Sequence, residues 1–200
     1  MPTTTADDLR RVALEEFAST GYHATSIQQI ADRAGVSKAT VLYHFASKDA
    51  LLEAVLSPAL DQLDQILQNV GLAGLRDGGA QRALFLEQFV DFLLEHRSAV
   101  YVFVNQSSSI DAPVITRAIR EIELMATFFE EHVDSVEQRV RFGVALGGAA
   151  YLLAGAPQVG PAITADLPEL RSALLAVLGD LLAVDPRQPA ALASASITTD

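Results

Sequence analysis

Hydrophobic residues recur every three or four positions along most of the chain, which predicts helices rather than strands. The first such stretch predicts a helix over about 6–20, and Gly21 suits the left-handed residue that follows a helix. The next stretch begins at Thr25, whose hydroxyl forms a capping-box pattern with Gln28. This second helix is predicted to stop at Gly35, so two short helices follow one another closely.

The pattern continues with one very short helix and one long one. Ser37 is expected to cap a helix of only about seven or eight residues, and Ser47 to cap a helix that continues through 51–67. Pro58 lies inside the longer helix and is expected to kink or split it. Glycines crowd positions 71–79, where we expect a loop.

Helical periodicity also dominates the rest of the chain. Four further helices are predicted over about 80–97, 98–109, 113–133 and 135–156. After a loop rich in Gly and Pro, Asp166 is expected to cap a last helix, with Glu169 three residues on. The sequence therefore predicts an all-α fold with about nine helices.

Composition supports this prediction and limits the chemistry. Half of the residues are apolar but only 6% are aromatic, and the helix formers Ala and Leu dominate. The absence of cysteine excludes disulfides and thiolate metal ligands and fits a reducing cytoplasm, where we expect the protein to act. The N-terminus lacks the pattern of a signal peptide. Prolines and glycine interrupt the uncharged stretch 142–165, which predicts a buried helix and a loop rather than a membrane span.

The charge is distributed unevenly. The net charge is −11, which on its own argues against binding to nucleic acid. Residues 1–48 nevertheless hold five basic and five acidic side chains and sum to zero, and both lysines of the protein lie there. The remaining residues carry the whole net charge, so the N-terminal segment remains compatible with DNA.

The run GVSKATVLYHF contains the short helix after Ser37. The preceding helix, a turn with glycine and this short helix together form the pattern of a helix-turn-helix, whose second helix enters the major groove. Val41 and Phe45 are expected to face the core, and the outward face is Lys38, Ala39, Leu42 and Tyr43. That face suits a DNA groove better than water alone.

The run GYHATSIQQIADRAGVSKATVLYHFASKDALLEAVL resembles the N-terminal domain of TetR-family transcriptional regulators, over roughly 9–56. The matching elements GY, ATS, IA, AGVS, TVLYHF, SK and LL occur in order with the right gaps. Carried over by this resemblance, the expected DNA-binding residues are Thr25, Ser26, Ser37, Lys38, Ala39, Thr40, Leu42, Tyr43, His44 and Lys48. Leu42 departs from the family, in which a tyrosine is common there, and is expected to trade that contact for one with a thymine methyl.

The resemblance implies a function and an organisation. It implies a homodimeric repressor that binds a palindromic operator in double-stranded DNA and is released by a small effector, largely apolar from the composition. Residues 1–48 would form the helix-turn-helix DNA-binding domain, 49–184 the effector-binding and dimerisation domain, and 185–200 a disordered tail. No membrane partner is expected. An activator on the same fold remains open, as does a ligand-binding or protein-interaction dimer without specific DNA binding.

Two sets of residues are candidates for the dimer interface and the effector pocket. Small residues four apart and a leucine face suit a helical interface, or equally an intrasubunit core: Gly143, Gly147, Tyr151, Leu170, Leu174, Val177, Leu178 and Leu181. Aromatic residues at helical spacing with a few polar ones suit a pocket, although plain core explains most of them: Phe85, Phe89, Phe92, Tyr101, Asn105, Phe128, His132 and Tyr151.

Other chemistry is not indicated. No phosphate-binding loop, nucleophile elbow, zinc-protease motif or dinucleotide fingerprint occurs. The four histidines are scattered, so no metal site, no cofactor and no enzymatic activity are expected.

Overall fold

The computed structural model describes residues 5–77, 80–132, 135–155 and 165–182, and its regular elements within these ranges are all helical. They are α1 (Thr5–Ser19), α2 (Ile27–Ala34), α3 (Lys38–His44), α4 (Lys48–Asp77), α5 (Ala80–Glu95), α6 (Arg97–Gln106), the 3₁₀ turn η1 (Ser107–Ser109), α7 (Pro113–His132), α8 (Val136–Gly155) and α9 (Leu167–Leu182). The predicted all-α class is confirmed. The tail expected to be disordered, 185–200, lies outside the described residues.

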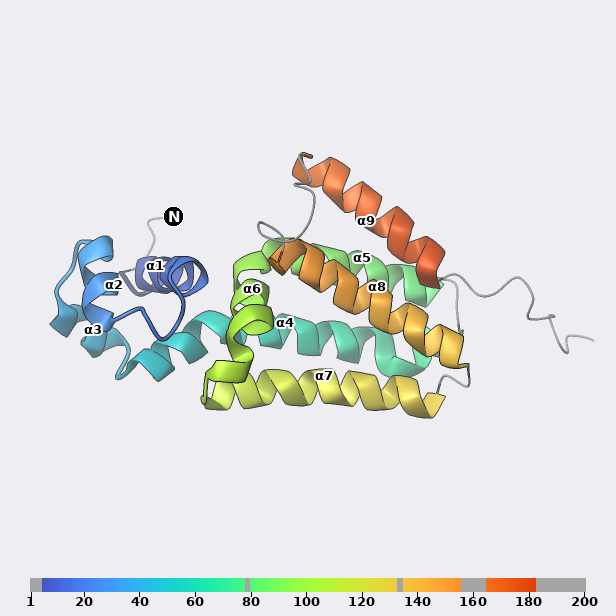
Figure 1. Ribbon diagram of the computed structural model, residues 1–200, viewed down its shortest axis with the longest axis horizontal. Coiled ribbons are helices and arrows are strands. Elements are labelled where there is room, and N and C mark those ends of the chain that lie inside the picture. The colour runs from blue at the N-terminus through green and yellow to red at the C-terminus, as the bar shows by residue number, and fades with distance from the viewer. Residues whose placement is uncertain (1–4, 78–79, 133–134, 156–164, 183–200) are drawn as a thin grey trace, which may run out of the picture.

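The helices form two groups joined by α4 (Figure 1). Helices α1, α2 and α3 lie together at one end, and we call them, with the start of α4, the head. Helices α5 to α9 gather at the other end around the rest of α4, and we call this group the body. Helix α4 packs against α1 in the head and against α5 and α7 in the body, so it belongs to both.

Local signals in the head place its short helices. Gly21 has a φ of 95° after α1, and Gly35 has a φ of 69° after α2, as predicted for residues in the left-handed region. Ser37 caps α3 by accepting from the Thr40 amide at 3.0 Å. The turn between α2 and α3 is therefore tight, and α3 starts at a fixed point relative to α2.

The predicted capping box of Thr25 and Gln28 is wrong by one residue. Ser26 is the cap of α2: its hydroxyl accepts from the Gln29 amide at 3.2 Å, and the Gln29 side chain accepts from the Ser26 amide at 2.7 Å. Thr25 is buried instead, and its hydroxyl donates to the Gly21 carbonyl at 2.8 Å. Both pairs have the right spacing, and burial of Thr25 decides between them.

Helix α4 extends further than predicted. Of the two outcomes expected at Pro58, a kink or a split, the split does not occur, since α4 runs through exposed Pro58 as one helix. It also continues through Gly71 and Gly74 to Asp77, where a loop was expected. A glycine in a helix costs only about 1 kcal/mol relative to alanine, less than neighbouring helix formers and packing can offset.

The body surrounds α4 and α5. Helix α5 packs against α4 and α9, α8 packs against α6, α9 and α5, and α7 packs against α4. None of the helices in the described ranges combines the length and apolarity needed to cross a membrane. Part of the uncharged stretch 142–165 lies in α8, as expected, and 156–164 lie outside the described residues.

Candidate DNA-binding face and ligand cavity

Helix α3 presents an exposed face of mixed chemistry. Its inward side chain, Val41, is fully buried, and Phe45 directly after the helix is buried too. Leu42 is 40% and Tyr43 86% exposed, and both are large side chains with apolar surface in water. Lys38, Ala39 and His44 are also exposed. Two apolar anchors therefore fix α3 against the head and leave the predicted reading face free.

Three of the other predicted contact residues surround the start of α2 and α3. Ser26 and Ser37 are exposed caps, and the Ser37 hydroxyl lies 2.8 Å from that of half-buried Thr40. A capping hydroxyl accepts through its oxygen, keeps its own O–H to donate, and remains near the helix amides, where anions bind. These residues are therefore placed to contact a phosphate beside the α3 face.

The structure places Thr25 and Lys48 differently from the expectation that they contact DNA. The Thr25 side chain is buried and hydrogen-bonded within the head. The Lys48 ammonium donates to the Tyr22 and Thr25 carbonyls, both at 3.0 Å, and lies 4.3 Å from the centroid of the Tyr22 ring. The Lys48 ammonium, which was expected from the sequence to contact DNA, is thus bound within the protein by two carbonyls and an aromatic ring.

Tyr22 adds a further contact to this cluster. Its hydroxyl donates to the Asp49 carboxylate. Burial raises the pKa of the Tyr22 hydroxyl, and the hydrogen bond and charge of Asp49 raise that pKa further, so the phenol stays protonated. The cluster of Tyr22, Lys48 and Asp49 fastens the start of α4 to the turn between α1 and α2.

Most of the positive charge in the head is neutralised within the head. Ion pairs join Arg10 to Asp7, Arg11 to Asp8 and Glu15, and Arg33 to Glu15 and Glu16. Lys48 is held by carbonyls. In the part of the head that the structure describes, Lys38 is thus the side-chain cation without an ion pair or hydrogen bond, and it lies on the exposed face of α3.

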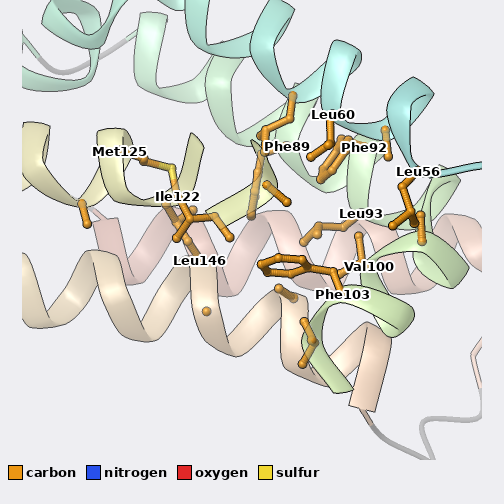
Figure 2. A pocket seen from close by; sticks show the side chains of 18 of the residues that line it. Leu56, Leu60, Phe89, Phe92, Leu93, Val100, Phe103, Ile122, Met125 and Leu146 are labelled. Carbon is orange, nitrogen blue, oxygen red and sulfur yellow. The ribbon is translucent and has the colours of Figure 1, made fainter. Parts of the chain in front are cut away.

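A cavity of about 350 Å³ lies in the body between α4, α5, α6, α7 and α8 (Figure 2). Every side chain that lines it is apolar, and the lining includes Leu60, Phe89, Phe92, Phe103, Ile122 and Leu146. The lining residues Ile122, Ala126, Gly143 and Gly147 are exposed, so the cavity reaches the surface between α7 and α8. Its size and walls suit a small apolar molecule.

Two of the residues expected in a pocket, Phe89 and Phe92, line this cavity. Phe85 is fully buried and stacks on Phe89 with ring centroids 5.6 Å apart, outside the lining. Tyr101, Asn105 and Tyr151 also lie outside the lining. Phe128 and His132 belong to α7, and their side chains are not among those described.

Sequence reasoning did not select most of the lining residues, among them Val100, Phe103, Val104, Ile122 and Met125. The first three recur at helical spacing on α6, which is a signal in the sequence. The same spacing is typical of buried core, however, so it does not distinguish a side chain beside a void from one beside another side chain.

The candidate interface residues fall into three environments. Leu174 and Leu178 are buried within the subunit, and Gly143 and Gly147 line the cavity. Tyr151 and Val177 are exposed, and Leu170 and Leu181 are half-buried. An apolar exposed face on α8 and α9 includes Tyr151 and Val177 together with residues not selected from the sequence: Val136, Val140, Val144, Leu152 and Leu167. We call these seven residues the α8–α9 face.

An exposed short helix on a three-helix head, joined to a helical body with an apolar cavity, is the arrangement of a helix-turn-helix protein. Residues 9–55 match the family model described as bacterial regulatory proteins, tetR family. This match confirms the predicted resemblance of residues 9–55 to the N-terminal part of TetR-family regulators.

Curated relatives support this assignment over part of their length. The chain is 34% identical to the transcriptional activator FasR of Mycolicibacterium smegmatis over 108 residues, which are 54% of this chain and 48% of that protein. It is 53% identical to the transcriptional regulator RutR of Escherichia coli over 49 residues, 24% of this chain and 23% of that one. The chain thus spans about half or less of the length of these relatives, which are named as a transcriptional activator and a transcriptional regulator.

Solved structures share the fold over nearly the whole chain. The ketosteroid transcriptional regulator KstR2 of Mycobacterium tuberculosis superposes with a TM-score of 0.69 at 15% identity, covering 91% of this chain and 95% of that one. The TetR-family regulator PfmR of Thermus thermophilus gives 0.64 at 21% identity, covering 90% and 96%. At this identity, the likeness establishes the fold of the body as well as the head.

Proposed function

We propose that the protein is a sequence-specific DNA-binding transcriptional regulator that acts as a homodimer and is released from a palindromic operator by a small apolar effector. The observation that carries the proposal is the exposed face of α3, seated by Val41 and Phe45 on a head of the TetR family. The two-part organisation is proposed as a DNA-binding head over 1–48 and an effector-binding and dimerising body over 49–184.

The α3 face would read the major groove. Lys38, Ala39, Tyr43 and His44 supply donors, an acceptor and a small side chain for close approach. Leu42 would pack against a thymine methyl, because it offers no hydrogen bond and is well exposed. Ser26, Ser37 and Thr40 would contact phosphates and set the register of α3 on the duplex.

The cavity would take the effector. Its lining has no polar side chain, so binding would come from burial of apolar surface, and a charged group would remain at the opening between α7 and α8. Occupancy would favour an arrangement of the heads that does not fit DNA, because a ligand shifts an equilibrium only through unequal affinity for its two states.

The α8–α9 face would form the dimer interface. Val140 and Val144 are more than half exposed on α8, as is Val177 on α9. Several exposed apolar side chains on two helices that pack together are typical of a contact with another protein. A two-fold axis through this face would pair α8 and α9 with their copies and present two heads to two half-sites of one palindrome.

Selection of bound sequences from a random duplex pool tests the proposal, at about 150 mM salt where binding to phosphates alone is weak. We expect enrichment of one palindrome with half-sites separated by whole helical turns. A folded, dimeric protein that enriches no sequence would overturn the proposed DNA-binding function and favour a ligand-binding dimer.

The sign of regulation has a separate test. FasR is named an activator, and KstR2 of Mycolicibacterium smegmatis, 33% identical over 101 residues, a repressor. We propose repression, which predicts higher expression from a reporter carrying the selected palindrome when the gene for this protein is deleted. Lower expression in the deletion strain would identify an activator.

A further inference from the structure

One side chain of the body reaches the head with two hydrogen bonds. Gln106, the last residue of α6, accepts from the Tyr22 amide through Oε1 at 2.7 Å. Its Nε2 donates to the Phe17 carbonyl at 2.8 Å. Phe17 belongs to α1 and Tyr22 follows it after Gly21, so the amide of one glutamine holds both sides of the turn between them.

The neighbouring contacts lie at the same boundary. The His23 ring donates from Nε2 to the Ser109 carbonyl at 2.8 Å, because a carbonyl can only accept. Helix α1 also packs against α6. This boundary is therefore a second connection between head and body, besides the continuous helix α4.

Helix α6 is also a wall of the cavity. Val100, Phe103 and Val104 line the cavity, and Phe103 precedes Gln106 by less than one helical turn. Phe103 and Gln106 belong to one ten-residue helix, so a ligand that displaces the backbone of α6 at Phe103 also displaces the Gln106 side chain. Hydrogen bonds of 2.7 and 2.8 Å are lost with a shift of about 1 Å, because their strength falls steeply with distance and angle.

The geometry requires an amide at this position. The Tyr22 amide needs an acceptor and the Phe17 carbonyl needs a donor, and a glutamine supplies both at the end of one side chain. Glutamate has the same shape but would place a carboxylate oxygen against the Phe17 carbonyl. Methionine has a similar length and offers neither a comparable acceptor nor a donor.

The Tyr22 backbone carries the contact further into the head. Its carbonyl accepts from Lys48, which also holds the Thr25 carbonyl directly before the start of α2. A displacement of the Tyr22 backbone thus reaches the first residues of α2 and α4, and through α2 the placement of α3.

We propose that Gln106 is the positioning residue that couples the cavity to the head: with the cavity empty it holds the turn after α1, and a ligand that displaces α6 releases it. This inference rests on the proposed function, in which the cavity takes an effector. It assigns the coupling to one side chain and predicts that ligand binding survives the loss of that side chain while the response of the head does not.

The test uses Gln106→Glu and Gln106→Met in the full chain, with Asn105→Ala as a matched control. Asn105 is the preceding residue and donates to the Tyr101 and Ala154 carbonyls, both within the body. The probe is N-phenyl-1-naphthylamine, an uncharged apolar fluorophore. Its binding is followed by fluorescence, and amide hydrogen exchange of 17–26 is measured with and without the probe.

We expect the probe to bind all four proteins within about threefold, because no variant changes the cavity lining. In the wild type and in Asn105→Ala the probe should speed exchange of the Tyr22 amide. In Gln106→Met the Tyr22 amide should exchange about tenfold faster without the probe, as for loss of one hydrogen bond in a buried site. In Gln106→Glu the carboxylate can still accept from the Tyr22 amide but is repelled by the Phe17 carbonyl, so that this amide should also exchange faster, by a smaller factor. In both variants the probe should add no further change.

Two results would overturn the inference: an unchanged exchange of 17–26 when the probe binds the wild type, or an equal response in the Gln106 variants. Because these measurements contain no DNA, they are independent of the duplex selection. A protein that enriches no palindrome but shows the Gln106-dependent response would refute the DNA-binding proposal and leave the coupling intact.

Discussion

At the scale of single residues, Lys38 and Lys48 show how far the environment decides the role of a side chain. Lys38 stands on the exposed face of α3 and has no ion pair in the described part of the head. Lys48 lies half-buried, with its ammonium between two carbonyls and the Tyr22 ring. The same residue type is therefore placed for an external partner at one site and for an internal one at the other.

The two lysines give a matched pair of predictions. Lys38→Ala should weaken operator binding by about 1–3 kcal/mol and leave the free energy of unfolding unchanged. Lys48→Ala should lower the free energy of unfolding by about 1.5–3 kcal/mol, because it removes charged hydrogen bonds to two carbonyls. Urea unfolding and duplex titration of both variants measure the two effects. A stable Lys48→Ala protein with weakened binding to every duplex would instead show a phosphate contact.

His96 predicts a pH dependence. Its ring donates from Nε2 to the Gln62 side chain at 2.6 Å, and burial lowers the pKa of the imidazole, with a smaller opposing effect of Glu95. Below pH 6.5, about the ordinary pKa of histidine, His96 is protonated in the unfolded chain but still largely neutral in the folded protein. Acid therefore favours unfolding. The free energy of unfolding should fall as pH drops from 7 towards 5.

The matching variant is His96→Gln, which cannot titrate. It should flatten this part of the pH profile, as followed by urea unfolding at several pH values. The Asp91 carboxylate does not interfere, because its pKa is lowered by hydrogen bonding to Arg171 and its contribution is lost only below about pH 4. An identical slope in both proteins between pH 7 and 5 would show that His96 is not responsible.

At the scale of elements, capping residues fix where the short helices of the head begin. Ser26→Ala should lower the free energy of unfolding by about 1 kcal/mol, because it leaves the Gln29 amide without its partner. Ser108→Ala is the control, since Ser108 is equally an exposed serine but has no side-chain hydrogen bond within the described ranges. Equal stabilities of the two variants in urea unfolding would argue against the cap.

The sequence predicts the order of the helices in the described ranges well, because apolar residues recur at helical spacing along them and several begin at a capping residue. It places the cap of α2 one residue early because Thr25–Gln28 and Ser26–Gln29 have the same spacing. It also ends α4 too soon, because two glycines resemble a loop although each costs little in a packed helix. The first error comes from the burial of Thr25, a tertiary contact that a local pattern does not contain.

The exposed side of α3 can also be predicted from the sequence, since Val41 and Phe45 define its buried side. The cavity cannot be predicted in this way. Its lining residues have the types and spacing of ordinary core, and whether a void lies between them depends on the separation of the five helices that contribute them. That separation is a property of helix packing rather than of any one segment.

At the scale of the whole molecule, the α8–α9 face leads to a prediction about assembly. Val144→Arg should weaken dimerisation at least tenfold, because a charge would have to be buried at the proposed interface. Leu124→Arg on α7 is a close control, since Leu124 and Val144 are both 56% exposed. Analytical ultracentrifugation measures both. A dimer that tolerates Val144→Arg would place the interface elsewhere.

The charge distribution of the head predicts how DNA binding responds to salt. Four of the five basic side chains in 1–48 are held within the protein, which leaves Lys38 of each subunit as a free cation in the described part of the head. The slope of log affinity against log salt should be about −2 for a dimer, and about −9 if all ten cations met phosphates. Titration of the selected palindrome between 50 and 200 mM salt, roughly the physiological range, distinguishes the two.

Helix α4 runs without interruption from the head into the body over 30 residues. Each residue inserted into or deleted from it would rotate the head by about 100° and move it by about 1.5 Å along the helix axis. Length changes in α4 would therefore turn α3 away from the groove, whereas substitutions keep its register. Chimaeras that graft this head onto another body would have to match the phase of α4 as well as its length.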